Sequence, residues 1–238
     1  MTKEYDQTTA FHYAAYRPAL HALILKKCIG ANEQFLFGLD IGCGTGLSTK
    51  ALLPYCVNVI GIDPSKEMLA QTVPTDNLRF LHFNGKKLSF DDAFFDIVTF
   101  AGSWYYAQSQ QLLNEVIRVA KSPFKVIVYD FEIDLDPTLS ALQINTSTIS
   151  PTPYNHRANF SNFNIGNLLV EQSKQEVVYI TITATNLAHV LLSSKDNYRL
   201  LETKFGEKHL FQLTKNSLQD QAKDHSLKAI LYYTTYKL

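Results

Sequence analysis

The chain has 238 residues, of which 46% are hydrophobic and 18% are charged. This size and composition are typical of a globular protein with a large hydrophobic core. Because 22 basic residues balance 22 acidic ones and no run of lysine or arginine occurs, no electrostatic field draws the chain onto nucleic acid or an anionic membrane. We expect neither of these partners.

The N-terminal sequence MTKEYDQTTA is polar and lacks the apolar segment of a signal peptide. No apolar run is long enough to span a bilayer, so we expect a cytoplasmic protein. The spacing of Leu20, Leu23 and Ile24 predicts a helix over about 18–28. We expect residues 1–30 to form an N-terminal helical cap.

Between residues 35 and 131, short apolar runs alternate with helical patterns. Near-continuous apolar strands that alternate with helices indicate an α/β fold, with a parallel sheet covered by helices on both faces. The clearest helix has a stripe of apolar residues on one side and charged residues on the other. The predicted strands are 35–41, 56–62, 78–83, 96–101 and 124–131, and the predicted helices between them are 47–53, 65–71 and 110–120.

After residue 132 the pattern changes. Residues 134–166 contain three prolines among many Asn, Ser and Thr, which predicts an irregular insertion, either a lid over the substrate or a surface excursion. No second domain with a core of its own is evident, so 1–238 is expected to be a single domain. Further strands are predicted over 176–183 and 228–236, with helices at about 186–204 and 206–222 between them.

The sequence LDIGCGTG at 39–46 places three glycines in five positions after the first predicted strand. A glycine-rich turn between a strand and a helix brings backbone N–H groups close to a ligand. A phosphate-binding P-loop needs Lys followed by Ser or Thr after its last glycine, whereas Leu47 and Ser48 follow here. The spacing is also GxGxG and not the GxGxxG of dinucleotide-binding proteins, which weakens a pyrophosphate interpretation.

The second predicted strand ends at Asp63, at the edge of the sheet where parallel α/β proteins bind their ligands. A carboxylate there can accept hydrogen bonds from both hydroxyls of a ribose. The alternative is that Asp63 only caps the helix predicted to start near Ser65. An acid one strand after a glycine turn favours ribose binding.

These two stretches, LDIGCGTG at 39–46 and GIDPS at 61–65, resemble the class I S-adenosylmethionine-dependent methyltransferases. The sequence LSFDDAFFD at 88–96 is similar to the LPFxDxxFD stretch of that family. Tyr13 with YRP at 16–18, and SWY at 103–105, resemble segments of the trans-aconitate-methyltransferase-like branch, in which His commonly stands in place of Ser103. The resemblance covers about residues 5–130.

The resemblance implies a Rossmann-like, doubly wound, mostly parallel seven-stranded sheet with an antiparallel final strand. It also implies S-adenosylmethionine as cofactor, and transfer of its methyl group to a small molecule by in-line displacement. The implied cofactor-binding residues are Asp40, Gly42, Cys43, Gly44 and Gly46 at the methionine moiety, Asp63 at the ribose, Pro64 and Met68 near the adenine, Asn84 and Gly85 at the adenine edge, and Ala101 with Gly102 beside the sulfonium.

Aromatic faces stabilise a sulfonium by roughly 0.5–2 kcal/mol, and several aromatic residues are candidates for such a wall. Arg17 is a candidate to bind a substrate carboxylate or to form a structural salt bridge. His12 and His156 are candidates for a general base, but no catalytic residue is assigned. The residues expected near the substrate are Tyr13, Tyr16, Arg17, Trp104, Tyr105 and His156.

The three cysteines and seven histidines lack the spacing of metal ligands, so no metal site is expected. A monomer or weak homodimer is expected. Two alternative functions are open: a protein that binds S-adenosylmethionine without methyltransferase activity, and a nicotinamide-dependent oxidoreductase.

Overall fold

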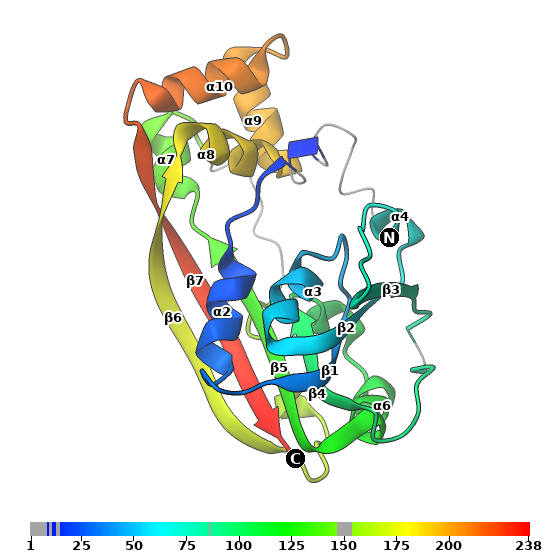
Figure 1. Ribbon diagram of the computed structural model, residues 1–238. Helices are drawn as coiled ribbons and strands as arrows, with labels where there is room; N and C mark the ends of the chain where they lie inside the picture. Colours follow the sequence, from blue (N-terminus) through cyan, green and yellow to red (C-terminus); the bar gives the residue numbers. More distant parts are fainter. Residues whose placement is uncertain (1–8, 10, 13–14, 86, 147–153) are drawn as a thin grey trace. The chain divides into compact units, whose positions relative to one another are not determined.

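The computed structural model describes residues 9, 11–12, 15–85, 87–146 and 154–238 (Figure 1). Its contacts divide the chain into two compact units. Unit 1 comprises Met1–Pro18, Glu132–Pro153 and Val177–Ile230, and unit 2 comprises Ala19–Phe131, Tyr154–Glu176 and Leu231–Leu238. The residues of the expected N-terminal cap at 1–30 are therefore divided between the two units.

The seven strands form one sheet in the order β3-β2-β1-β4-β5-β7-β6. The first five strands pair in parallel. The direction of β7 is opposite to that of β5, as the backbone hydrogen bonds from Leu238 to Phe124 and from Asp134 to Lys228 require (Figure 1). This confirms the predicted sheet with an antiparallel final strand. The strands are β1 (Phe35–Ile41), β2 (Cys56–Asp63), β3 (Leu78–His82), β4 (Phe95–Ala101), β5 (Ala120–Ile133), β6 (Leu169–Thr183) and β7 (Asp224–Lys237).

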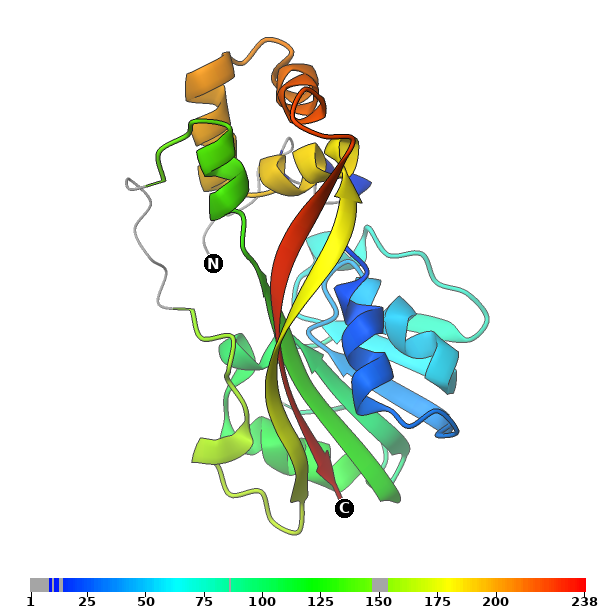
Figure 2. The ribbon, with the colours of Figure 1, turned by 90° about the vertical axis from the view of Figure 1, so that its left-hand side faces the viewer.

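Helices cover both faces of the sheet in unit 2 (Figure 2). Leu39 and Ile41 of β1 belong to the same hydrophobic cluster as the buried residues of α6. Asp40 lies between them in sequence and accepts hydrogen bonds from Ser48 and Thr49 of α3. Because successive strand residues point to opposite faces, α3 and α6 lie on opposite sides of β1. The helices of unit 2 are α2 (Leu20–Cys28), α3 (Leu47–Leu52), η1 (Leu53–Tyr55), α4 (Lys66–Leu69), α5 (Trp104–Ala107), α6 (Gln110–Val119) and η2 (Phe160–Asn162).

The predicted apolar stripe of α6 is buried in the core of unit 2. Leu112, Leu113 and Val116 are at most 1% exposed and belong to one hydrophobic cluster with core side chains of β4 and β5. The Ser109 hydroxyl caps the helix by accepting a hydrogen bond from the Leu112 N–H at 3.1 Å. An amphipathic period and a serine cap thus fix this helix locally.

Unit 1 has its own apolar cluster, built around α8 and its neighbouring helices. The sequence predicted one helix over 186–204, but the helix is interrupted at Ser193. The Ser193 hydroxyl donates to the Val190 carbonyl at 2.7 Å, and such side-chain bonds to the backbone favour helix ends. The 134–166 segment is also less irregular than predicted, because it contains α7 and η2. The helices of unit 1 whose bounds lie in the described residues are α7 (Asp136–Ala141), α8 (Ala184–Leu192), α9 (Lys195–Phe205) and α10 (Leu210–Gln219).

Candidate functional site

The glycine turn after β1 is a tight bend with one open side. Gly42, Gly44 and Gly46 all have left-handed backbone angles, with φ of +75°, +54° and +85°. A Cβ on Gly42 would lie 2.3 Å from the Ser103 Cβ, and a Cβ on Gly46 would lie 2.6 Å from the Phe80 ring. A Cβ on Gly44 would meet no atom within 4 Å. Two of the glycines therefore allow close packing, and the third faces open space.

Asp63 connects this bend to the end of β2. Its Oδ2 accepts a hydrogen bond from the Gly44 N–H at 2.8 Å, and its Oδ1 accepts one from the Ser65 N–H at 2.8 Å. The cap of α4 is Ser65, whose hydroxyl accepts from the Met68 N–H at 3.2 Å. The alternative in which Asp63 is itself the helix cap is therefore wrong. A carboxylate has about four acceptor positions, so two of them remain for other donors.

Asp40, near the end of β1, connects that strand to the helix that follows the bend. Its side chain is 0% exposed, and it accepts hydrogen bonds from three hydroxyls: Ser48 at 2.6 Å, Thr49 at 2.8 Å and Thr99 at 2.8 Å. Burial raises the pKa of this carboxyl. The hydrogen bonds from the three hydroxyls lower it in part, and the charge of the nearby Asp63 raises it. The resemblance implied direct contact with the methionine moiety, but Asp40 is 0% exposed and its oxygens accept the three hydroxyls.

The remaining residues implied for the cofactor follow the ends of neighbouring parallel strands. In the register, Asp40 pairs with Gly61 and Asp63 pairs with His82, so the carboxyl ends of β1, β2 and β3 share one edge. Ligands bind at this edge in open parallel sheets. Cys43 is 5% exposed, and burial raises the pKa of its thiol. Pro64, Asn84 and Gly85 are exposed, whereas Met68, Ala101 and Gly102 are half-buried.

The SWY segment after β4 has a structural role at two of its three positions. The Ser103 hydroxyl donates to the Ile41 carbonyl and so ties the end of β4 to the end of β1. Trp104 is 1% exposed, packs against Phe160 at 4.6 Å between ring centroids, and donates from Nε1 to the Asn159 carbonyl at 2.9 Å. The expectation that Trp104 contacts substrate is therefore corrected, because its indole lies in the core.

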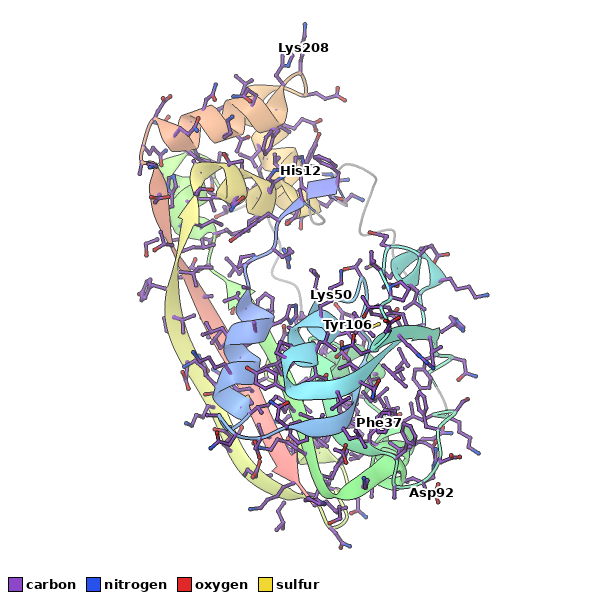
Figure 3. All side chains as sticks on the ribbon, viewed as in Figure 1. His12, Phe37, Lys50, Asp92, Tyr106 and Lys208 are labelled. Carbon is purple, nitrogen blue, oxygen red and sulfur yellow. The ribbon has the colours of Figure 1, made fainter. Side chains whose placement is uncertain are left out.

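Tyrosines and an acid lie close together beside the carboxyl end of β4. The Tyr154 ring lies 4.5 Å from that of Tyr105 and 5.5 Å from that of Tyr106. Tyr106 is 73% exposed, and its side chain is labelled in Figure 3. The Tyr154 hydroxyl lies 2.7 Å from the Asp130 Oδ2, and the His156 Nδ1 lies 3.0 Å from the same oxygen. The structure thus brings Tyr105 and His156 into one cluster.

Asp130 and Tyr154 are site residues that sequence reasoning missed. Asp130 follows the apolar run VIVY in the strand sequence FKVIVYDF, and a charge directly after this buried run was the available signal. Tyr154 lies within the Pro-rich 134–166 segment, where no local pattern distinguishes it from its neighbours.

The other candidates expected near the substrate lie in unit 1 or outside the described residues. Tyr16 packs against the apolar cluster of unit 1, and Arg17 donates from Nη1 to the Ser193 hydroxyl at 3.4 Å. Tyr13 lies outside the described residues. Contact of these three residues with a substrate stays a prediction.

The described ranges contain no group of three or more His, Cys, Asp or Glu side chains that could hold a metal ion. Nor does this part of the chain include a helix with the length and hydropathy needed to cross a membrane.

Comparisons with known proteins agree with this geometry. Residues 39–127 match a family model described as a methyltransferase domain. The chain is 33% identical over 108 residues to the uncharacterized methyltransferase YcgJ of Bacillus subtilis, which covers 42% of this chain and 43% of that protein. It is 36% identical over 99 residues to a demethylmenaquinone methyltransferase of Shouchella clausii, and this match covers 37% of this chain and 42% of that protein. The chain thus spans less than half the length of these curated relatives.

The fold itself extends beyond the matched segment. A solved putative type II methyltransferase from Anaeromyxobacter dehalogenans superposes with a TM-score of 0.62, covering 93% of this chain and 97% of that one at 13% identity. At this identity the likeness concerns the fold alone.

Proposed function

We propose that this protein transfers the methyl group of S-adenosylmethionine to a small molecule. The match of residues 39–127 to the methyltransferase family model supports this proposal. The net charge of +0 favours a small acceptor over nucleic acid or a membrane, and a cytoplasmic location is part of the same proposal.

The observation that carries the proposal is the open side of Gly44 beside the Asp63 carboxylate. The bend presents bare backbone to the space in which a ligand would lie. Asp63 is fixed there by two backbone N–H groups and keeps acceptor positions for other donors. A nucleoside brings two vicinal hydroxyls, which are suitable donors for one carboxylate. These residues therefore fit the adenosyl part of the cofactor.

S-adenosylmethionine supplies an electrophilic methyl group on a positively charged sulfur, so the chemistry of the reaction resides in the cofactor. The protein contributes placement and exclusion of water. The Gly42–Gly46 bend would hold the methionine part, and Asp63 would hold the ribose. Ala101 and Gly102 would flank the methyl group, with Tyr105 beside them. Holding the acceptor in line with the carbon–sulfur bond is worth several kcal/mol without any catalytic side chain.

Calorimetry with S-adenosylhomocysteine tests cofactor binding. We expect the wild-type protein to bind it, and Asp63→Asn to bind it about 10–100-fold more weakly, because hydrogen bonds to a charged group are worth about 1.5–3 kcal/mol. Asp76→Asn removes the same charge from an exposed position between α4 and β3 and is the matched control. Equal affinity in wild type and Asp63→Asn, or tighter binding of NAD than of S-adenosylhomocysteine, contradicts the proposal.

Transfer itself is tested by following S-adenosylhomocysteine formation over a panel of small hydroxyl, amine, thiol and carboxylate compounds. Formation of a methylated product supports the proposal. Tight cofactor binding without turnover on any panel member, or on a metabolite extract, favours a binding protein that does not methylate.

A further inference from the structure

The Asp130 carboxylate lies on β5 directly after Tyr129, which pairs with Ala101 at the end of β4, and it has three hydrogen-bond partners among the described residues. Its Oδ1 accepts from the Phe131 N–H at 2.7 Å. Its Oδ2 lies 2.7 Å from the Tyr154 hydroxyl and 3.0 Å from the His156 Nδ1. Burial and the charge of Asp130 raise the pKa of Tyr154, so the phenol stays protonated and donates.

The contact between the Asp130 Oδ2 and the His156 Nδ1 determines which ring nitrogen of His156 holds the proton. An ionised carboxylate only accepts hydrogen bonds, so the His156 Nδ1 must carry a hydrogen. In the neutral imidazole the lone pair is then on Nε2. A carboxylate that fixes the tautomer of a histidine in this way makes the opposite nitrogen the basic one.

The same cluster reaches the place where a methyl group would be transferred. The Tyr154 hydroxyl lies 2.9 Å from the Gly102 carbonyl oxygen, directly after β4. A Cβ on Gly102 would lie 3.2 Å from the Asp130 Oδ1, so this backbone passes close to the acid. The Tyr154 ring lies 4.7 Å from the His156 ring. The Tyr154 side chain therefore lies between His156 and the end of β4, which would flank the sulfonium.

We propose that His156 is the general base for an acceptor that carries a hydroxyl group, and that Asp130 and Tyr154 are the positioning residues that hold it. This inference rests on the proposed methyltransferase function. The oxygen of the acceptor forms a bond to the methyl carbon while the carbon–sulfur bond breaks and its electron pair goes to sulfur. The hydroxyl proton moves to the Nε2 of His156 and then to solvent.

The need for a base selects the class of acceptor. A carboxylate is already ionised at neutral pH and has no proton to lose, whereas a phenol or enol hydroxyl must lose one. Aromatic rings beside the cluster, those of Tyr105 and Tyr106, suit a planar acceptor of this kind. We therefore expect methylation at oxygen of an aromatic or enolic hydroxyl.

Several groups face His156 and influence its protonation. Asp130 faces His156 from β5, and Tyr154 faces it from two residues earlier in the same loop. The Tyr232 ring of β7 stacks on the imidazole at 5.7 Å with an angle of 13°. The Arg157 guanidinium lies 5.8 Å from the centre of that Tyr232 ring. Of these, Asp130 is the group in direct contact with a ring nitrogen.

Nuclear magnetic resonance of the full chain with ¹⁵N-labelled histidine tests the geometry without an acceptor. The His156 signals are identified by their loss in His156→Gln. At pH 7.5 we expect a protonated Nδ1 and an unprotonated Nε2, and a mixed or reversed tautomer in Asp130→Asn. An imidazole protonated on both nitrogens, or an Nε2–H tautomer in the wild type, overturns the proposal.

Kinetics on the panel above test the chemistry. For a hydroxyl acceptor, His156→Gln should lower kcat by about 10²-fold or more, while KM and the affinity for S-adenosylhomocysteine change little. Asp130→Asn should lower kcat by about tenfold or more and move the pH profile, and Tyr154→Phe should act in the same direction but less. His209→Asn removes an exposed imidazole in unit 1 and should leave kcat unchanged.

An unchanged kcat in His156→Gln overturns the assignment, as does methylation confined to carboxylates. Failure of the proposed function has a different signature. In that case S-adenosylhomocysteine does not bind the wild-type protein, although the His156 tautomer is still observed.

Discussion

The backbone N–H of Gly44 donates to the Asp63 Oδ2 at 2.8 Å, so the bend after β1 and the end of β2 form one hydrogen-bonded unit. This bond holds the acid next to the open side of the bend. Replacing Gly44 with Asn tests whether that open side is where the ligand lies. Asparagine tolerates the left-handed backbone, and its side chain would enter the space that is empty beside Gly44.

We expect Gly44→Asn to fold with a melting temperature close to that of the wild type but to lose S-adenosylhomocysteine affinity by at least about tenfold, as measured by calorimetry. Gly166→Asn is the matched control, because Gly166 also has a left-handed φ of +55° and is exposed. Similar losses of affinity in both variants would mean that the bend does not contact the ligand.

The buried Asp40 predicts a large effect on stability. Asp40→Ala removes the acceptor of three buried hydroxyls, those of Ser48, Thr49 and Thr99. Leaving buried donors without an acceptor costs about 1–3 kcal/mol for each group that water does not reach. We expect the free energy of unfolding in urea to fall by at least about 2 kcal/mol. Asp91→Ala, at an exposed position, should change it by less than about 0.5 kcal/mol.

The single tryptophan of the sequence reports on the core and not on the site. Trp104 is 1% exposed and packs against Phe100, Phe160 and Phe163. We expect its fluorescence to be poorly quenched by acrylamide, and S-adenosylhomocysteine to change this quenching little. Trp104→Ala should lower the free energy of unfolding by about 3–5 kcal/mol. Strong quenching in the native protein that a bound ligand prevents would place the indole at the site instead.

A histidine pair in unit 1 predicts a loss of stability in mild acid. The Nδ1 atom of His12, which is labelled in Figure 3, lies 2.9 Å from the Nδ1 atom of His189. Burial together with the proximity of His189 lowers the pKa of His12 to about 4. The unfolded chain, in which the pKa of histidine is about 6.5, therefore binds more protons than the folded chain between these two pH values. Stability is present above pH 6.5 and is lost as the pH falls toward 4.

We expect protonation of His12 to lower the free energy of unfolding by about 1–3 kcal/mol as the pH falls from 7 to 4.5. Urea unfolding at several pH values measures it. His12→Phe keeps a ring that can pack against Phe211 but does not titrate, so its stability should depend less on pH over this range. An identical pH dependence in wild type and His12→Phe would assign the effect to other groups.

Much of the fold was predictable, because it is encoded locally. The apolar run Phe35–Ile41 and the helix that starts at Gln110 have the predicted bounds to within one residue. Continuous apolar strands that alternate with amphipathic helices leave few arrangements other than a parallel sheet with two covered faces. The break at Ser193 was not predicted, because serine is tolerated within helices and ends one only where its hydroxyl bonds to the backbone.

The candidate site was predictable only in part. The sequence alone determined the glycine bend and the acid that follows one strand later, because both lie at strand ends where local pattern fixes their place. The tertiary structure decided that Asp40 and Trp104 are buried, and that Asp130, Tyr154 and His156 form one cluster beside Gly102. The physical reason is that burial and side-chain contact depend on which distant segments pack together, and no local spacing in the chain records that.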